Sequence, residues 1–145
     1  VGGSTVTTAS DASKWDSFIK RVGNLDTSAD MVFVMGGTND CIRNVSIGSI
    51  NDTGVTTFYG AYNSVINTLK TNFPEKTIVL ATPLYYSGIN WSTNGSWGGS
   101  ANIEKYGDAV KAIGKKYNFH SVLFSLLLNS KNKFHFFKRY ASASL

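Results

Sequence analysis

The chain has 145 residues, of which 42% are hydrophobic and 16% are charged. This composition predicts one globular domain with its own core. The net charge of +5 is unevenly placed, because residues 1–118 carry ten basic and nine acidic side chains, whereas residues 119–145 carry four basic side chains and no acidic ones. The body of the chain therefore gives no electrostatic reason to expect a nucleic-acid partner. We also expect neither a signal peptide nor a transmembrane segment, since no apolar run approaches about 18 residues.

Cysteine and histidine are too sparse for a disulfide or a metal centre. Cys41 is the single cysteine, and the two histidines, His120 and His135, lie far apart. We therefore predict no internal disulfide, no metal and no cofactor. Cys41 is interpreted as an incidental thiol, because no neighbouring residue offers a base to activate it.

The first thirty residues predict the end of a strand, a turn and one helix. Val1 to Thr8 resembles a strand terminus with its exit turn. The segment 10–13 contains residues that cap helices. An apolar face with helical spacing follows, made of Trp15, Phe18, Ile19 and Val22. Gly23-Asn24 is a suitable end for this helix.

The stretch from Met31 to Asp40 predicts a central strand followed by the candidate site. Met31 to Met35 is a run of five apolar residues, which predicts a strand buried on both faces in a parallel sheet. The run then opens into Gly36-Gly37-Thr38-Asn39-Asp40. Open α/β sheets place their chemistry at such strand ends. The Asn39 amide, with two N–H donors, suits an oxyanion hole. The alternative is an ordinary turn, which uses the same residue types. A phosphate loop is disfavoured, because neither glycine-rich phosphate motif is present.

The remaining segments alternate between helices and strands. We expect a polar loop over 41–57, an amphipathic helix over 56–72 and a second buried strand over 76–83. A long loop with four aromatic residues over 85–100 and a third helix over 101–117 follow, and residues 121–124 could add a last strand. This order predicts an α/β domain with a parallel sheet between helical layers.

From about residue 119 the character of the chain changes. Every glycine, proline and acidic residue lies before this point, and the tail is basic and aromatic. The tail could form a surface helix or a membrane-touching segment. We favour a third interpretation, in which it no longer encodes the original domain, as after a reading-frame shift.

The motif Gly37-Thr38-Asn39-Asp40 after a buried strand resembles the SGNH, or GDSL-type, hydrolases. These esterases and lipases carry a Gly-x-Asn-Asp block at such a position. The resemblance covers about residues 1–118 and implies a three-layer, flavodoxin-like α/β/α fold, incomplete at the N-terminus and divergent over 119–145. It implies that the Asn39 amide and the Gly3 backbone N–H form the oxyanion hole. The substrate would be a small-molecule, lipid or carbohydrate ester.

The chain departs from this family in two blocks. It contains no Gly-Asp-Ser, which carries the nucleophilic serine, and no Asp-x-x-His, which carries the base and its orienting acid. His135 is preceded by Asn132 at minus three, which imitates that pair weakly. His120, preceded by Tyr117, is interpreted as structural.

Three hypotheses follow for function. The first is the central portion of an SGNH ester hydrolase that acts through a serine acyl-transfer mechanism and is inactive, or nearly so, as the chain stands. The second is a non-catalytic module that binds a carbohydrate or polymer through the aromatic loop over 85–97. The third is a fragment without function, whose exposed sheet edge would favour aggregation.

Overall fold

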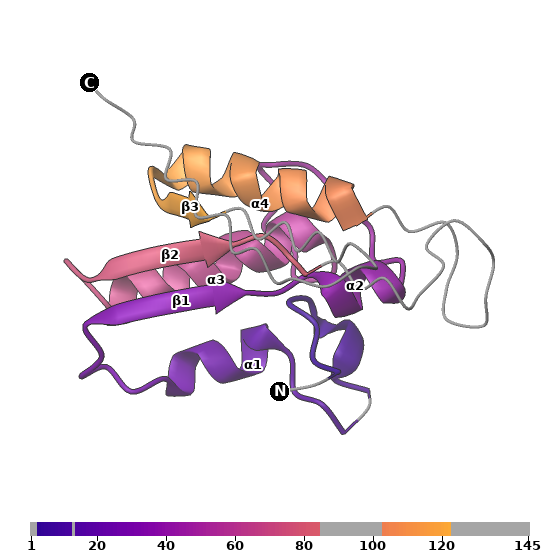
Figure 1. The fold of residues 1–145 in the computed structure, drawn as a ribbon. Helices are drawn as coiled ribbons and strands as arrows, with labels where there is room; N and C mark the ends of the chain where they lie inside the picture. Colours follow the sequence, from indigo (N-terminus) through magenta and orange to yellow (C-terminus); the bar gives the residue numbers. More distant parts are fainter. Residues whose placement is uncertain (1–2, 13, 85–102, 123–145) are drawn as a thin grey trace, which may run out of the picture.

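The structure, a computed structural model, describes residues 3–12, 14–84 and 103–122. Its helices and strands follow one another along the chain as shown in Figure 1. In chain order they are η1 (Thr8–Ser10), α1 (Phe18–Arg21), η2 (Val22–Asn24), β1 (Met31–Met35), α2 (Thr38–Ile42), α3 (Phe58–Asn72), β2 (Thr77–Ala81), α4 (Ile103–Tyr117) and β3 (His120–Val122), where η marks a 3₁₀ helix.

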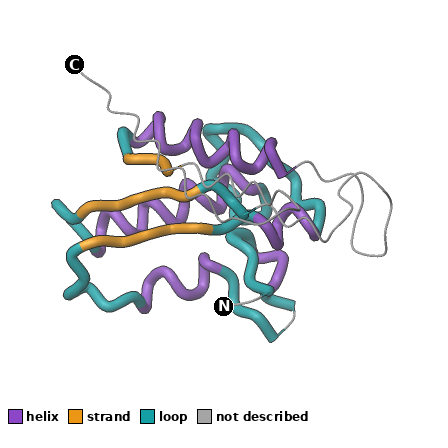
Figure 2. The backbone as a smooth tube through the Cα atoms, viewed as in Figure 1, coloured by secondary structure: helices purple, strands orange, loops and turns teal. Residues whose placement is uncertain are grey.

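The described strands form one parallel sheet in the order β1-β2-β3. The register places Val32 beside Ile78 and Val34 beside Leu80. The helices α3 and α4 form the crossovers between neighbouring strands (Figure 2). The predicted α/β class with a parallel sheet is therefore confirmed.

One face of the sheet packs against α3 and α4. The buried side chains of β1 and β2 lie in the same core cluster as those of the two helices. The helices contribute mainly aliphatic residues with helical spacing: Val65, Ile66, Leu69, Val110 and Ile113. Thr57 caps α3, because its side chain accepts a hydrogen bond from the Gly60 N–H. The predicted helices over 56–72 and 101–117 and the strand over 76–83 are thus confirmed as α3, α4 and β2. α3 is two residues shorter than predicted and β2 three residues shorter, and residues 101–102 lie outside the described residues.

The prediction that β1 is buried on both faces is wrong for this structure. Val32 and Val34 are buried, whereas Met31, Phe33 and Met35 are 58%, 50% and 39% exposed. Successive side chains of a strand point to opposite faces, so an unbroken apolar run cannot reveal which face is covered. Burial here alternates along the strand.

The predicted first helix is also wrong at its start. Its residues instead form the short α1 and η2, and Trp15 precedes them. The helix cap is Ser17, whose hydroxyl accepts from the Lys20 N–H, and not the segment 10–13. Asp11 is engaged elsewhere, because its carboxylate accepts from the Ser17 N–H at 2.8 Å. The apolar spacing correctly indicated that Phe18, Ile19 and Val22 pack on the core. The helix nevertheless begins only at Phe18, because Ser17 caps it.

The polar segment after α2 is anchored to the body. The prediction of a loop from 41 to 57 missed α2, which includes Cys41 and Ile42. Further along, the Asn63 amide donates to the carbonyls of Ile50 and Asp52 at 3.0 and 2.8 Å. These bonds fix the loop against α3.

Several predictions lie wholly or partly outside the described residues. The aromatic loop over 85–100 and most of the tail belong to this group. The last predicted strand is present as β3 over His120–Val122, and residues 123–124 lie outside.

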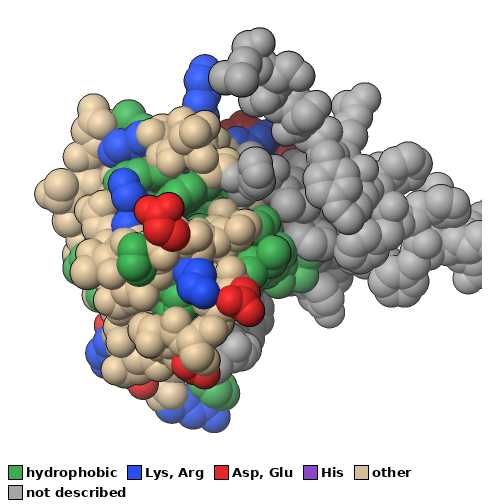
Figure 3. Space-filling view, turned by 90° about the vertical axis from the view of Figure 1, so that its left-hand side faces the viewer, with side chains coloured by type: hydrophobic (Ala, Val, Ile, Leu, Met, Phe, Trp, Pro, Cys, Tyr) green, Lys and Arg blue, Asp and Glu red, His purple; other side chains and the backbone are tan. Residues whose placement is uncertain are grey.

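The end of the molecule where the strands begin carries both signs of charge (Figure 3). There the Lys76 ammonium lies 3.1 Å from the Asp30 carboxylate. Asp30 is almost fully exposed, so this ion pair adds little stability. In this view, neither sign of charge forms a patch of its own.

We predict that Phe58 is a main contributor to stability. Its ring is fully buried and packs edge-to-face on Tyr62 and Tyr106, with centroids 5.0 and 4.9 Å away. Phe58→Ala should lower the free energy of unfolding by about 3–5 kcal/mol, because it leaves a cavity. Urea denaturation followed by circular dichroism measures the loss. Met31→Ala, which truncates an exposed apolar side chain, should cost less than about 1 kcal/mol, and equal losses would contradict the packing described.

Candidate active site

The candidate site lies beyond the carboxyl ends of β1 and β2. There α2 and residues 3–12 come together in space, although they are far apart in sequence (Figure 1). The chain leaves β1 through Gly36 and turns sharply at Gly37, which has φ +122° and precedes the first turn of α2. A Cβ atom on Gly37 would lie 2.9 Å from the Phe58 ring. Both the backbone angle and the close packing therefore require glycine here.

Asn39 is the second residue of α2 and reaches across to the N-terminal segment. Its Nδ2 atom donates a hydrogen bond to the Ser4 carbonyl oxygen at 2.8 Å. An amide nitrogen carries two hydrogens, so this bond orients the group and leaves the second hydrogen for another acceptor. The side chain is only partly buried. It can therefore be reached from solvent.

Gly3 lies next to the residue that Asn39 contacts. Its φ of +86° falls in the left-handed region. A Cβ atom at Gly3 would meet the Trp15 ring at 2.7 Å. Trp15 thus has a structural role that its helical spacing did not indicate. The structure brings together two of the three predicted site residues, Gly3 and Asn39.

Asp40 is fully buried and binds the same N-terminal segment. One carboxylate oxygen accepts from the Val6 N–H at 2.8 Å. The other accepts from the Thr7 N–H at 3.0 Å and from the Thr7 hydroxyl at 2.8 Å. Burial raises the pKa of the Asp40 carboxyl, and these three hydrogen bonds oppose that rise. Asp40 is not among the predicted site residues, and its place beside Asn39 is the only signal for it in the sequence.

A second group of buried hydroxyls closes the N-terminal segment on itself. The Thr5 hydroxyl donates to the Thr7 carbonyl at 2.6 Å. The backbone N–H of Ser10 donates to the Thr5 hydroxyl at 3.0 Å, and the Ser10 hydroxyl accepts from the Thr5 N–H at 3.1 Å. The segment therefore keeps its shape through polar contacts more than through regular secondary structure.

Neither Ser4 nor Cys41 is placed as a nucleophile. Ser4 is 5% exposed, and its hydroxyl donates to the Asp16 carbonyl at 2.8 Å. Cys41 is fully buried, and burial together with the nearby Asp40 charge raises the pKa of its thiol to about 12. A thiol with so high a pKa is almost never ionised near neutral pH. These contacts agree with the interpretation of Cys41 as an incidental thiol.

The two histidines differ in whether the structure describes their backbone. His135 lies outside the described residues. His120 begins β3, and its backbone pairs with Val79 in the sheet register. The proposed role of His135 as a base stays a prediction.

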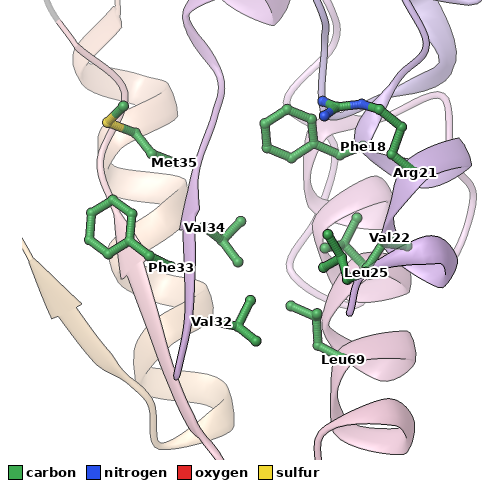
Figure 4. A pocket seen from close by; sticks show the side chains of 10 residues that line it. Phe18, Arg21, Val22, Leu25, Val32, Phe33, Val34, Met35 and Leu69 are labelled. Carbon is green, nitrogen blue, oxygen red and sulfur yellow. The ribbon is translucent and has the colours of Figure 1, made fainter. Parts of the chain in front are cut away.

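A separate groove of about 180 Å³ runs between β1 and the α1–η2 segment. Figure 4 shows Val32 and Val34 pointing into it from β1, while Phe33 and Met35 point to the other face of the strand. None of Gly3, Asn39 or Asp40 lines this groove. It is therefore distinct from the candidate site.

The described residues were also compared with two further kinds of feature, a metal centre and a membrane-spanning helix. Within them, no three histidine, cysteine or acidic side chains gather closely enough to hold a metal ion. No described helix combines the length and apolar character needed to cross a bilayer.

Comparison with known families identifies the class of this protein. The family model of the GDSL-like lipase/acylhydrolase family matches residues 1–138. The chain therefore belongs to that family, as its Gly-x-Asn-Asp motif indicated. A search of curated protein sequences finds no match to the chain.

Solved structures show the same fold. A protein from Lactobacillus plantarum shares 26% identity with a TM-score of 0.66, and the match covers 83% of this chain and 57% of that one. A protein from Bacteroides uniformis, provisionally named a GDSL-like lipase, shares 26% identity with a TM-score of 0.59 over 90% of this chain and 55% of that one. A "possible lipase" from Chitinophaga pinensis shares 28% identity with a TM-score of 0.58 over 79% and 52%. The chain thus spans about half the length of the structures that it matches.

The turn before α2 should not accept a side chain. We predict that Gly37→Ala lowers the free energy of unfolding by about 1–3 kcal/mol, because alanine is strained at this φ and its methyl group would press on Phe58. Gly23→Ala is the matched control, since nothing lies within 4 Å of its added methyl group. The control should change stability by no more than about 1 kcal/mol. Urea midpoints compare the two variants, and similar losses would refute the claim.

The thiol of Cys41 should be inert in the folded protein. Because its pKa is raised to about 12, the thiolate fraction stays very small at pH 8 and grows only as the pH approaches that value. We predict that Ellman's reagent labels the native chain at pH 8 far more slowly than the chain in guanidinium chloride. Rapid labelling of the native chain would mean that Cys41 is accessible and ionised.

Proposed function

We propose that Gly3 and Asn39 form the oxyanion hole of an ester hydrolase that works by acyl transfer to a serine. The observation that carries this proposal is the hydrogen bond from Asn39 Nδ2 to the Ser4 carbonyl at 2.8 Å. It fixes a neutral, directional donor beside the left-handed Gly3, at the end of the sheet where α/β proteins bind ligands. Family membership supports an ester as substrate.

The reaction needs two groups besides this hole. A serine oxygen attacks the ester carbonyl carbon while a histidine accepts the serine proton. The negative charge then builds on the former carbonyl oxygen, where the Gly3 N–H and the free hydrogen of Asn39 would bind it. The alcohol leaves with the proton from the histidine, and water releases the acid by the same steps. A small-molecule, lipid or carbohydrate ester fits this chemistry.

The 145 residues contain no Gly-Asp-Ser and no Asp-x-x-His. An oxyanion hole without a nucleophile and base retains only weak catalysis. We therefore expect the chain by itself to hydrolyse esters at close to the uncatalysed rate. The division between the hydrolase-like part, residues 1–118, and the tail at 119–145 stays part of this proposal. No described contact favours polymer binding by the aromatic loop.

The first test is to sequence the DNA on both sides of the coding region in all frames. We expect a Gly-Asp-Ser block upstream and an Asp-x-x-His block downstream in some frame. The absence of both blocks within a domain's length would overturn the hydrolase proposal for this chain. A purified 145-residue chain that cleaves p-nitrophenyl acetate at ordinary enzyme rates would instead overturn the expected inactivity.

The second test concerns Asn39 in a gene product that includes the Gly-Asp-Ser block. We predict that Asn39→Ala lowers kcat for p-nitrophenyl acetate by about 10²–10³ with little change in KM, because the donor acts mainly in the transition state. Asn67→Ala, at an exposed position of α3, is the matched control and should retain full activity. Equal activity of both variants would remove Asn39 from the proposed mechanism.

A further inference from the structure

The two proposed oxyanion donors come from segments that are far apart in sequence. Gly3 belongs to the N-terminal segment, and Asn39 belongs to α2. Their separation in space must be correct to within a fraction of an ångström for both to reach one oxygen atom. The hydrogen bond from Asn39 to Ser4 is a single, partly exposed contact. One such bond does not fix the orientation of two segments.

The buried carboxylate of Asp40 supplies the missing constraint. It follows Asn39 directly in α2, and its two partners, Val6 and Thr7, lie three and four residues after Gly3. Three hydrogen bonds of 2.8–3.0 Å join the carboxylate to this segment, two of them to backbone N–H groups. Because each oxygen has its own backbone donor, the contact fixes both distance and orientation.

We propose that Asp40 is a positioning residue that sets the geometry between the Gly3 N–H and the Asn39 amide. The proposal rests on the proposed function, because it assigns those two groups to the oxyanion hole. Asp40 touches no substrate in this role. A carboxylate is required, since it presents acceptors on both oxygens, whereas a carboxamide would turn an NH₂ group toward a backbone N–H.

Nuclear magnetic resonance of the full 145-residue chain tests this role without any catalysis. In the original chain we expect the Asn39 side-chain NH₂ group to show two well-separated proton signals, of which the proton bound to Ser4 exchanges slowly. In Asp40→Asn, these signals should move to the position of an exposed asparagine, and protection should fall at least tenfold. The Gly3 amide signal should shift as well. Signals from α3 and β2 should stay in place.

Asp52→Asn is the matched control. The Asp52 carboxylate also accepts from a backbone N–H and a threonine hydroxyl, those of Ser49 and Thr57. It belongs to the loop before α3, and its side chain bonds to Ser49 and Thr57 of that loop, not to residues 3–7 or α2. This variant should leave the Asn39 and Gly3 signals unchanged. The same signal changes in Asp52→Asn would show that they report general loosening, and the proposal would fail.

Thr7→Val keeps the proposal testable if Asp40→Asn does not fold. It removes the hydroxyl bond to Asp40 and a weaker one from the Ala9 N–H, while the backbone bonds remain. We expect the Asn39 signals to shift in the same direction by a smaller amount. Unchanged Asn39 and Gly3 signals in this variant, or in a folded Asp40→Asn chain, would overturn the proposal.

The outcome is separable from that of the proposed function. Failure of Asn39→Ala to slow ester hydrolysis would refute the oxyanion role even if Asp40 orders the two donors. Unperturbed donors in the Asp40 and Thr7 variants would refute the positioning role even if Asn39 is needed for hydrolysis.

Discussion

The geometry of the candidate site depends on a buried carboxylate that joins two distant parts of the chain. Asp40 accepts hydrogen bonds from Val6 and Thr7, and this contact places residues 3–7 against the start of α2. Burying a carboxylate is costly unless its oxygens find donors. Here two of the three donors are the backbone N–H groups of Val6 and Thr7. These residues lie in a segment with little regular secondary structure, so Asp40 provides the acceptor that a helix or sheet would otherwise provide. The same contact thus gives hydrogen-bond partners both to the buried carboxylate and to the backbone N–H groups of the N-terminal segment.

Aromatic residues of the hydrophobic core contact the segments on both sides of α2. Phe58 fills the space beside Gly37, and the Tyr62 hydroxyl donates to the Gly36 carbonyl at 3.3 Å. From α4, the Tyr106 hydroxyl donates to the Val45 carbonyl just after α2. Burial raises the pKa of both tyrosines, so they remain neutral donors. The segments just before and just after α2, which contains Asn39, are therefore held by aromatic residues of α3 and α4 that also form the core.

The family match and the position of the Asn39 motif are consistent with each other. The GDSL-like lipase/acylhydrolase family model matches most of the chain, and the Asn39 amide is held at the carboxyl end of the sheet. Ser4, whose carbonyl oxygen accepts from Asn39, and Cys41 are both buried and do not provide a nucleophile. Under the proposed function, the described residues would bind a developing negative charge but would not supply the nucleophile that generates it.

The amino-acid sequence by itself determined the α/β class, the long helices α3 and α4, the strand β2 and the motif with Asn39. These features rest on hydrophobic periodicity and on local residue types, which act over a few positions. Only the tertiary structure decided which face of β1 is buried, where α1 begins and what Trp15 contacts. It also decided that Asp40 binds Val6 and Thr7, more than thirty positions away. Contacts between distant segments leave no periodic signal in the chain, because they depend on how the whole fold brings those segments together.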